Sequence, residues 1–146
     1  MTGASSGAPF SFAIIIYFAK KFLKTSRIII AVGWLLLVTV LLCIPGTQLP
    51  KIKWDSKVLL DKWIHVFLFF LLVWFWCRIY IRNEKKIFIT ICILAILYGI
   101  IMEIVQHYFI PFRSFDVGDM IADAIGSVIA YFVFIKQNKN NPAGNI

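Results

Sequence analysis

The sequence predicts an all-α membrane protein built as a four-helix transmembrane bundle. Three observations predict it: 61% of the 146 residues are hydrophobic, the mean hydropathy is +0.87, and the few charged residues (15%) are bunched between long apolar runs. A soluble domain is typically about half apolar, with roughly a quarter of its residues charged. A chain this short could not hide so much apolar surface from water, so we expect the bilayer to be its solvent.

Four apolar runs are long enough to cross roughly 30 Å of hydrocarbon as helices. They cover residues 28–44, 58–80, 87–109 and 117–135. Pro45 ends the first run and Pro111 follows the third, and proline cannot continue a helix. An earlier apolar stretch, residues 10–19, is too short to span and precedes a basic cluster, which favours an amphipathic segment lying on the membrane surface. The predicted organisation is a disordered tail and interfacial segment over residues 1–27, a transmembrane domain over 28–135 and a disordered tail over 136–146.

The chain has a net charge of +8, from 15 basic and 7 acidic residues. The basic residues stand at the edges of the apolar runs, where they meet lipid head groups, so the excess does not indicate nucleic-acid binding. Ten of the Lys and Arg residues fall on the side that would hold both termini and five on the other. This bias predicts that both termini are cytoplasmic.

Ionisable side chains interrupt three of the four apolar runs. Each costs roughly 2.5 to 3.5 kcal/mol at the middle of a bilayer, so several together need pairing, water or protonation. The second run carries Asp61 and His65, the third carries Glu103 and the neutral amide Gln106, and the fourth carries Asp119 and Asp123, with Arg113 and Asp116 in the loop before it.

These polar groups are predicted to meet at one end of the bundle. Asp61 and His65 are four residues apart, so both project from one face of their helix. The start of the second span, the end of the third and the start of the fourth share one membrane side, which the charge bias makes the outer side. We therefore expect a polar cavity on the extracytoplasmic side. A structural alternative is that the groups pair with one another and with Arg113 to hold the helices together.

Several short motifs occur in a fixed order between Pro45 and Ala130. They are Asp61-Lys62-x-x-His65, Tyr98-Gly99, Glu103-x-x-Gln106 and Arg113-x-x-Asp116-x-x-Asp119, followed by Gly126. In order and spacing they resemble the VanZ-like family of small bacterial membrane proteins, named after a protein that confers low-level teicoplanin resistance. The resemblance implies a place in the bacterial cytoplasmic (inner) membrane and a link to the cell envelope, and it supplies no reaction. The chain departs from the family pattern at Asp123, where asparagine is expected, and at Ala130, where glycine is expected.

Two functions from different classes fit the pattern. The first is an envelope-associated accessory protein, linked to glycopeptide (teicoplanin) resistance, whose cavity binds a lipid-linked envelope precursor or a lipid head group. Its binding residues would be Gln106, Arg113, Asp116, Asp119 and Asp123. A proton-coupled carrier is a weaker possibility, and with four spans it would need to be a homo-oligomer.

The second function is a metal-dependent or acid/base membrane enzyme that acts on a lipid-linked or head-group substrate at the outer leaflet. Carboxylates are hard ligands suited to Mg²⁺ or Mn²⁺, and the candidate metal ligands are Asp119, Asp123 and Glu103. The candidate catalytic residues are His65 as general base, Asp61 as the group that orients it, and Glu103. A metal-free version would use His65 and Glu103 for proton transfer.

Overall fold

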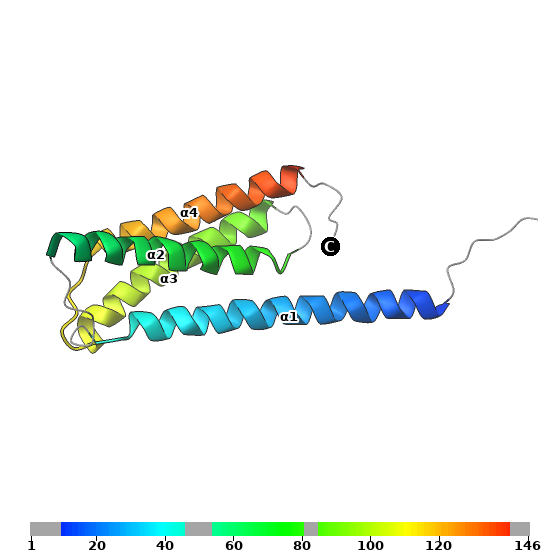
Figure 1. The fold of residues 1–146 in the computed structure, drawn as a ribbon, viewed down its shortest axis with the longest axis horizontal. Coiled ribbons are helices and arrows are strands. Elements are labelled where there is room, and N and C mark those ends of the chain that lie inside the picture. The colour runs from blue at the N-terminus through cyan, green and yellow to red at the C-terminus, as the bar shows by residue number, and fades with distance from the viewer. Residues whose placement is uncertain (1–9, 46–53, 81–84, 141–146) are drawn as a thin grey trace, which may run out of the picture.

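The computed structural model describes residues 10–45, 54–80 and 85–140, and these form four helices without a strand. The helices are α1 (Phe10–Leu42), α2 (Trp54–Cys77), α3 (Lys85–Phe109) and α4 (Val117–Asn140). All four contain a segment long and apolar enough to cross a membrane. The predicted all-α, multi-pass four-helix bundle is therefore confirmed (Figure 1).

The first helix differs from the prediction. The sequence suggested a separate interfacial segment before the first span, whereas α1 runs without a break from Phe10 to Leu42, and its candidate span begins at Tyr17. The physical reason lies in the basic stretch from Lys20 to Arg27, which contains neither proline nor glycine and so offers no point at which the helix ends. Residues 1–9, expected to be a disordered tail, lie outside the described part of the chain.

The last helix is longer than predicted. The sequence placed a disordered tail from residue 136 onward, whereas α4 continues to Asn140. The first proline after the span is Pro142, and Lys139 in the last turn is favourable at a helix C-terminus, so nothing stops the helix at residue 135. Residues 141–146 lie outside the described part of the chain.

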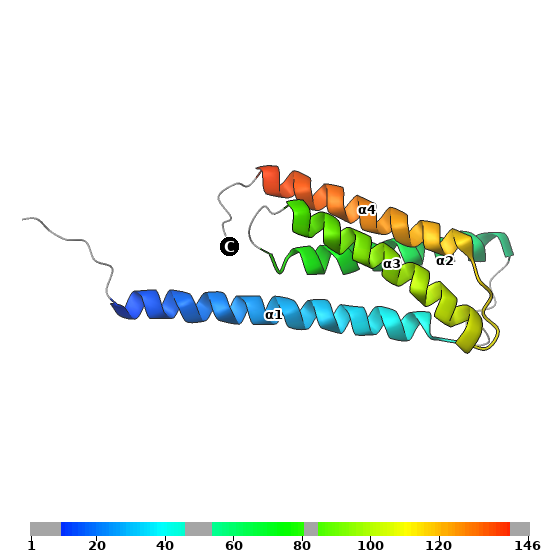
Figure 2. The ribbon, with the colours of Figure 1, turned by 180° about the vertical axis from the view of Figure 1, so that it is seen from behind.

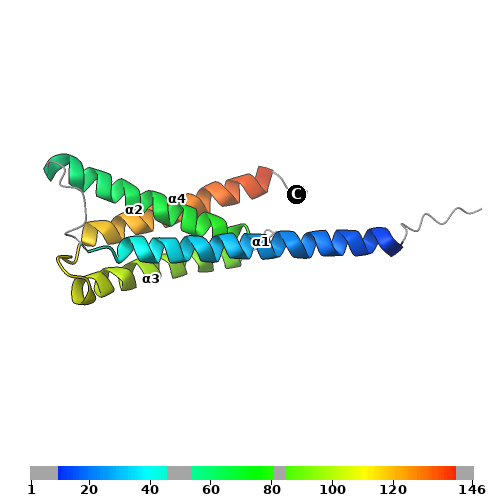
Figure 3. The ribbon, with the colours of Figure 1, turned by 60° about the horizontal axis from the view of Figure 1, so that its bottom comes forward.

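Helices α2, α3 and α4 pack together, and α1 lies along one side of them (Figures 2 and 3). Hydrogen bonds attach α1 to its neighbours within the bilayer: Trp34 Nε1 donates to the carbonyl of Leu68 at 3.1 Å, and the hydroxyls of Thr39 and Tyr98 are 2.9 Å apart. Polar contacts of this kind join membrane helices because lipid supplies no hydrophobic force between them.

Close approach of α2 and α4 depends on Gly126. A Cβ atom at that position would collide with the backbone carbonyl of Val66 on α2. The neighbours of Gly126 one turn away on either side, Ala122 and Ala130, are also buried. These small residues of α4 are thus at the centre of the bundle, and they allow the two backbones to pack closely.

The ends of the helices separate into two groups. The C-terminal ends of α1 and α3 lie beside the N-terminal ends of α2 and α4, whereas α1 begins and α4 ends at the opposite end of the bundle (Figure 1). Toward that opposite end the core is aromatic, with the rings of Phe88 and Phe134 4.9 Å apart. We call one end of the bundle the polar end. It is the end where α1 and α3 finish, at Leu42 and Phe109, and where α2 and α4 begin, at Trp54 and Val117.

Candidate functional site

Ionisable side chains from three helices gather at the polar end. His65, Glu103, Asp119 and Asp123 are each at most 4% exposed, and Asp61, Lys62 and Asp116 are partly buried beside them. We call these seven residues the polar cluster. The predicted convergence of the second, third and fourth spans is therefore what the structure shows.

His65 on α2 is held by Asp123 on α4. The Nδ1 atom of His65 lies 2.9 Å from Oδ1 of Asp123, a geometry in which the imidazole N–H donates to the carboxylate. The other ring nitrogen, Nε2, lies 3.9 Å from Oδ2 of Asp119, which is too far for a hydrogen bond. Among the described residues Nε2 has no hydrogen-bonding partner, so this nitrogen is available to a ligand.

Asp123 is fixed in turn by a close neighbour on α3. A Cβ atom at Gly99 would lie 2.6 Å from Oδ2 of Asp123, so only glycine leaves room for the carboxylate. The sequence assigned the orienting role to Asp61, one turn before His65 on the same helix. That assignment was wrong, because Nδ1 faces α4 and its partner there is Asp123.

Lys62 bridges a carboxylate of α4 and one just before that helix, and it is the site residue that the sequence did not predict. Its Nζ atom lies 3.0 Å from Oδ2 of Asp116 and 2.8 Å from Oδ1 of Asp119. The signal was present in the sequence, because Lys62 precedes His65 by three residues and so shares its helix face. Lys62 therefore neutralises part of the buried negative charge.

Asp116 organises the start of α4. Its Oδ1 accepts a hydrogen bond from the backbone N–H of Gly118 at 2.6 Å, which is an N-terminal cap. Its own backbone N–H donates to Oε2 of Glu103 at 3.2 Å, which ties α4 to α3. The hydrogen bond from Lys62 lowers the pKa of Asp116 below its ordinary value of 3.8.

Gln106 and Arg113 donate hydrogen bonds to the backbone where α1 ends. Gln106 Nε2 donates to the carbonyl of Leu42 at 2.8 Å, and Arg113 Nε donates to the carbonyl of Ile44 at 3.4 Å. The last carbonyls of a helix have no partner within it, so Gln106 satisfies a group that α1 leaves open, and Arg113 bonds the chain two residues beyond the helix end. The sequence suggested ion pairs between Arg113 and the carboxylates, but none is present among the described residues, where its partner is a backbone carbonyl.

The residues placed to hold a metal ion differ from the predicted set. One ligand atom from each of Asp61, His65 and Asp119 lies within 4.8 Å of the other two. The sequence grouped Asp119 with Asp123 and Glu103 instead. Of the three predicted ligands only Asp119 belongs to the group that the structure brings together, and Asp61 and His65 take the other two places.

The polar cluster carries excess negative charge. It contains five carboxyl groups, with Lys62 as its permanent cation and His65 as a group that becomes cationic on protonation. Buried carboxylates need compensation by protons, cations or hydrogen bonds. The arrangement therefore favours a ligand that brings positive charge, and it contains an oriented imidazole that can accept or donate a proton.

Comparison with known proteins identifies the family of the chain. No curated protein and no solved structure matches the chain. The family model described as VanZ/LLP1 matches residues 9–137, which include all four helices up to the last turn of α4 and every residue of the polar cluster. The chain therefore belongs to the VanZ/LLP1 family.

Proposed function

We propose that this protein works in the bacterial cell envelope by binding the polar part of a lipid-linked molecule or a lipid head group in the polar cluster, and that this binding reduces sensitivity to teicoplanin. The observation that carries the proposal is the Nε2 atom of the buried His65, which has no hydrogen-bond partner among the described residues and faces Asp119 at 3.9 Å at one end of a membrane bundle. Family membership supports the link to glycopeptide resistance.

A purely structural role would leave these features unexplained. The pairs His65–Asp123 and Lys62–Asp119 already join α2 to α4, and Gly126 lets the two backbones pack closely. Asp61 makes no hydrogen bond or ion pair to α4 among the described residues, the Nε2 atom of His65 lies beyond hydrogen-bond distance of Asp119, and an additional carboxylate near Asp119 raises the electrostatic cost of the joint. Ionisable groups inside a membrane bundle that are not needed for packing indicate a site.

The charge of the cluster defines the chemistry of the ligand. Because carboxylates outnumber cationic side chains, the favoured ligand carries an amine, or a phosphate that arrives with a divalent cation. Arg113 donates one hydrogen bond, from Nε, to a backbone carbonyl. Within this proposal Asp61, Asp119 and His65 Nε2 contact the ligand, whereas Lys62 and Asp123 position them.

The basic-residue bias supports a polar end that faces the outside, with both termini in the cytoplasm. A reporter enzyme fused to the C-terminus, active only outside the cytoplasm, tests this orientation. We expect no activity from that fusion and activity from the same reporter inserted after Ser114, in the turn between α3 and α4. The reverse pattern would place the polar end inside and contradict the proposed access from the outer leaflet.

The functional test is teicoplanin susceptibility in a sensitive host that expresses the wild type, Glu103→Gln and Asp119→Asn at matched membrane levels. We expect the wild type to protect and both variants to lose protection, since each removes a charge from the cluster and keeps the shape of the side chain. Equal protection by both variants would show that the cluster is structural. No protection by the wild type would refute the link to teicoplanin.

A second candidate function is a membrane enzyme, and the orientation of His65 favours it. A carboxylate on one imidazole nitrogen raises the basicity of the other and fixes its direction, as in general bases and in metal-bound histidines. Asp61, His65 and Asp119 would hold Mn²⁺ or Mg²⁺, and such an ion would polarise a phosphoryl oxygen. In the metal-free form His65 would act as the base.

The metal content of the purified protein decides between the metal-dependent and the metal-free version of this enzyme. Purified protein in detergent is dialysed against Mn²⁺ and then against buffer, and the retained metal is measured for the wild type, Asp61→Asn and His107→Gln. His107 is an exposed histidine outside the cluster and serves as the matched control. We expect the control to retain the metal and Asp61→Asn to lose it. No retention of metal by the wild type would exclude the metal-dependent enzyme.

A further inference from the structure

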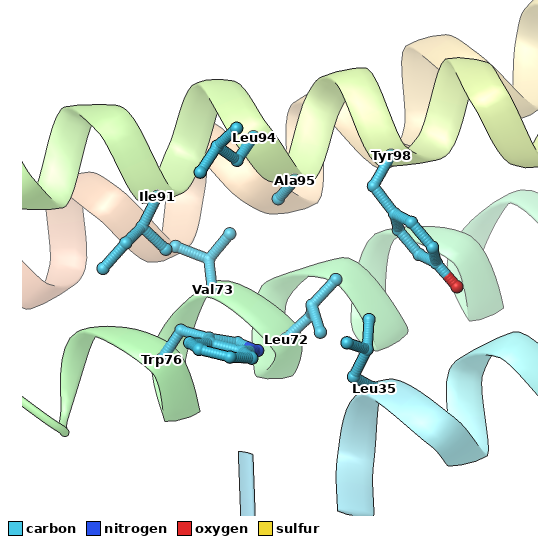
Figure 4. Close-up of a pocket in the computed structure, with 8 residues that line it drawn as sticks. All are labelled: Leu35, Leu72, Val73, Trp76, Ile91, Leu94, Ala95 and Tyr98. Atoms are coloured by element: carbon cyan, nitrogen blue, oxygen red, sulfur yellow. The ribbon is translucent and has the colours of Figure 1, made fainter. Parts of the chain in front are cut away.

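An apolar cavity of about 230 Å³ lies between α1, α2 and α3. Leu35 of α1, Leu72 and Trp76 of α2, and Ala95 and Tyr98 of α3 line it (Figure 4). All these residues belong to the candidate membrane spans, so the cavity is at the level of the hydrocarbon. It exceeds the roughly 150 Å³ of an apolar cavity that stays dry and binds benzene, so its volume suits a length of hydrocarbon chain.

The cavity is held open by the attachment of α1. Leu35 forms the α1 side of the cavity, and the residues on either side of it bond the neighbouring helices. Trp34 donates to the carbonyl of Leu68, and the hydroxyl of Thr39 bonds that of Tyr98. These two hydrogen bonds set the distance of α1 from α2 and α3 on either side of Leu35. The space between the helices is therefore a defined feature of the fold.

The cavity and the polar cluster share helices α2 and α3. Tyr98 lines the cavity and bonds Thr39 of α1, and the next residue, Gly99, packs against Asp123 of α4. Along α2, Trp76 lies eleven residues beyond His65, a rise of roughly 16 Å at 1.5 Å per residue. A polar site and an apolar cavity thus follow one another along α2 and α3, in the order in which a lipid carries its head group and its tail.

We propose that this cavity binds the hydrocarbon tail of the same lipid whose head group occupies the polar cluster. The inference rests on the proposed function and narrows the ligand to an amphiphile. This amphiphile enters from the outer leaflet and places at least one hydrocarbon chain between α1 and α3. Binding of the tail supplies affinity through apolar contact, and the cluster supplies selectivity through charge. A soluble head-group analogue without a tail should therefore bind weakly.

The test uses a phosphatidylethanolamine whose acyl chain carries a terminal diazirine, because its head group combines an amine with a phosphate. The protein is reconstituted with it in nanodiscs and irradiated, and mass spectrometry locates the crosslinked residues. Ala95→Trp fills the cavity, and Leu35→Trp fills it from the α1 side in case the first variant does not fold. The control is Ile93→Trp, which adds the same bulk to α3 at a half-exposed, lipid-facing position.

We expect crosslinks at cavity residues in the wild type and in Ile93→Trp, and their loss in both cavity-filling variants. Crosslinks spread over the outer faces of the helices and unchanged by Ala95→Trp would show ordinary boundary lipid and overturn the proposal. That result would leave the proposed function intact if Asp119→Asn still abolishes teicoplanin protection. Crosslinking in the cavity with no effect of Asp119→Asn on protection would instead uphold the tail site and contradict the proposed function.

Discussion

His65 and Asp123, residues that are 2% and 1% exposed, form a buried contact of 2.9 Å between α2 and α4. The contact does two things at once. It joins the two helices, and it directs the second imidazole nitrogen toward Oδ2 of Asp119, which at 3.9 Å is beyond hydrogen-bond distance. Stability and function can therefore be separated by substitutions that affect one nitrogen of His65 and spare the other.

The contact predicts different outcomes for two substitutions of Asp123. Asp123→Asn keeps an oxygen that accepts from His65 Nδ1, so the melting temperature in detergent should change little. Asp123→Leu leaves a buried imidazole N–H without a partner and should destabilise the bundle by about 1–2 kcal/mol. Thermal unfolding followed by circular dichroism measures both, and equal stability of the two variants would contradict the contact.

Lys62 and Asp119 should be energetically coupled. Lys62→Met leaves the buried Asp119 carboxylate without its cation and should destabilise the protein by about 1–2 kcal/mol, less than for a fully buried pair because the Lys62 side chain is 31% exposed. Adding Asp119→Asn to Lys62→Met should recover part of that loss. A double-mutant cycle measures the coupling, and strictly additive effects would refute the pairing.

The capping contact of Asp116 predicts a dependence on pH. Its pKa in the folded protein is below the ordinary 3.8 because Lys62 donates a hydrogen bond to the ionised form. The stability that this ionised side chain contributes is therefore fully present above pH 3.8 and is lost as the pH falls through the lower, folded-state pKa. Melting temperatures of the wild type should fall below pH 3.8 more steeply than those of Asp116→Asn; parallel curves would contradict the assignment.

Two helical glycines should respond in opposite ways to the same substitution. Gly126→Ala places a methyl group against the carbonyl of Val66 and should cost about 1–3 kcal/mol by overpacking. Gly33→Ala meets nothing within 4 Å and should stabilise α1 slightly, by roughly 0.5–1 kcal/mol. Melting temperatures of the two variants compare them directly. A similar loss in both would show that α2 and α4 do not approach closely at Gly126.

Much of the fold could be predicted from the sequence because the bilayer imposes a strong signal. Long apolar runs, and prolines just beyond two of them, locate the spans. The four-span topology then brings Glu103 beside the start of α4. The errors concern places where that signal is weak. The polarity of the basic stretch Lys20–Arg27 suggested a boundary between two segments. The stretch has no helix breaker, however, so the helix continues through it.

Partners within the site were harder to predict than its location. Helical spacing shows that Asp61 and His65 share a face, but the rotation of α2 against α4 decides that Asp123 meets Nδ1. That rotation depends on packing details such as Gly126 against Val66 and Gly99 against Asp123, which involve residues far apart in the sequence. For the same reason Arg113, a reasonable partner for carboxylates by charge, instead satisfies the end of α1.

The most direct test of the central claim compares one substitution at the two histidines. His65→Asn keeps an amide N–H where Nδ1 donates to Asp123 and removes the outer part of the ring, including Nε2, whereas His107→Asn changes an exposed histidine outside the polar cluster. Teicoplanin susceptibility is measured for both at matched membrane levels and matched melting temperatures. We predict that His65→Asn loses protection and His107→Asn keeps it; full protection by a stable His65→Asn would show that the polar cluster only holds the helices together.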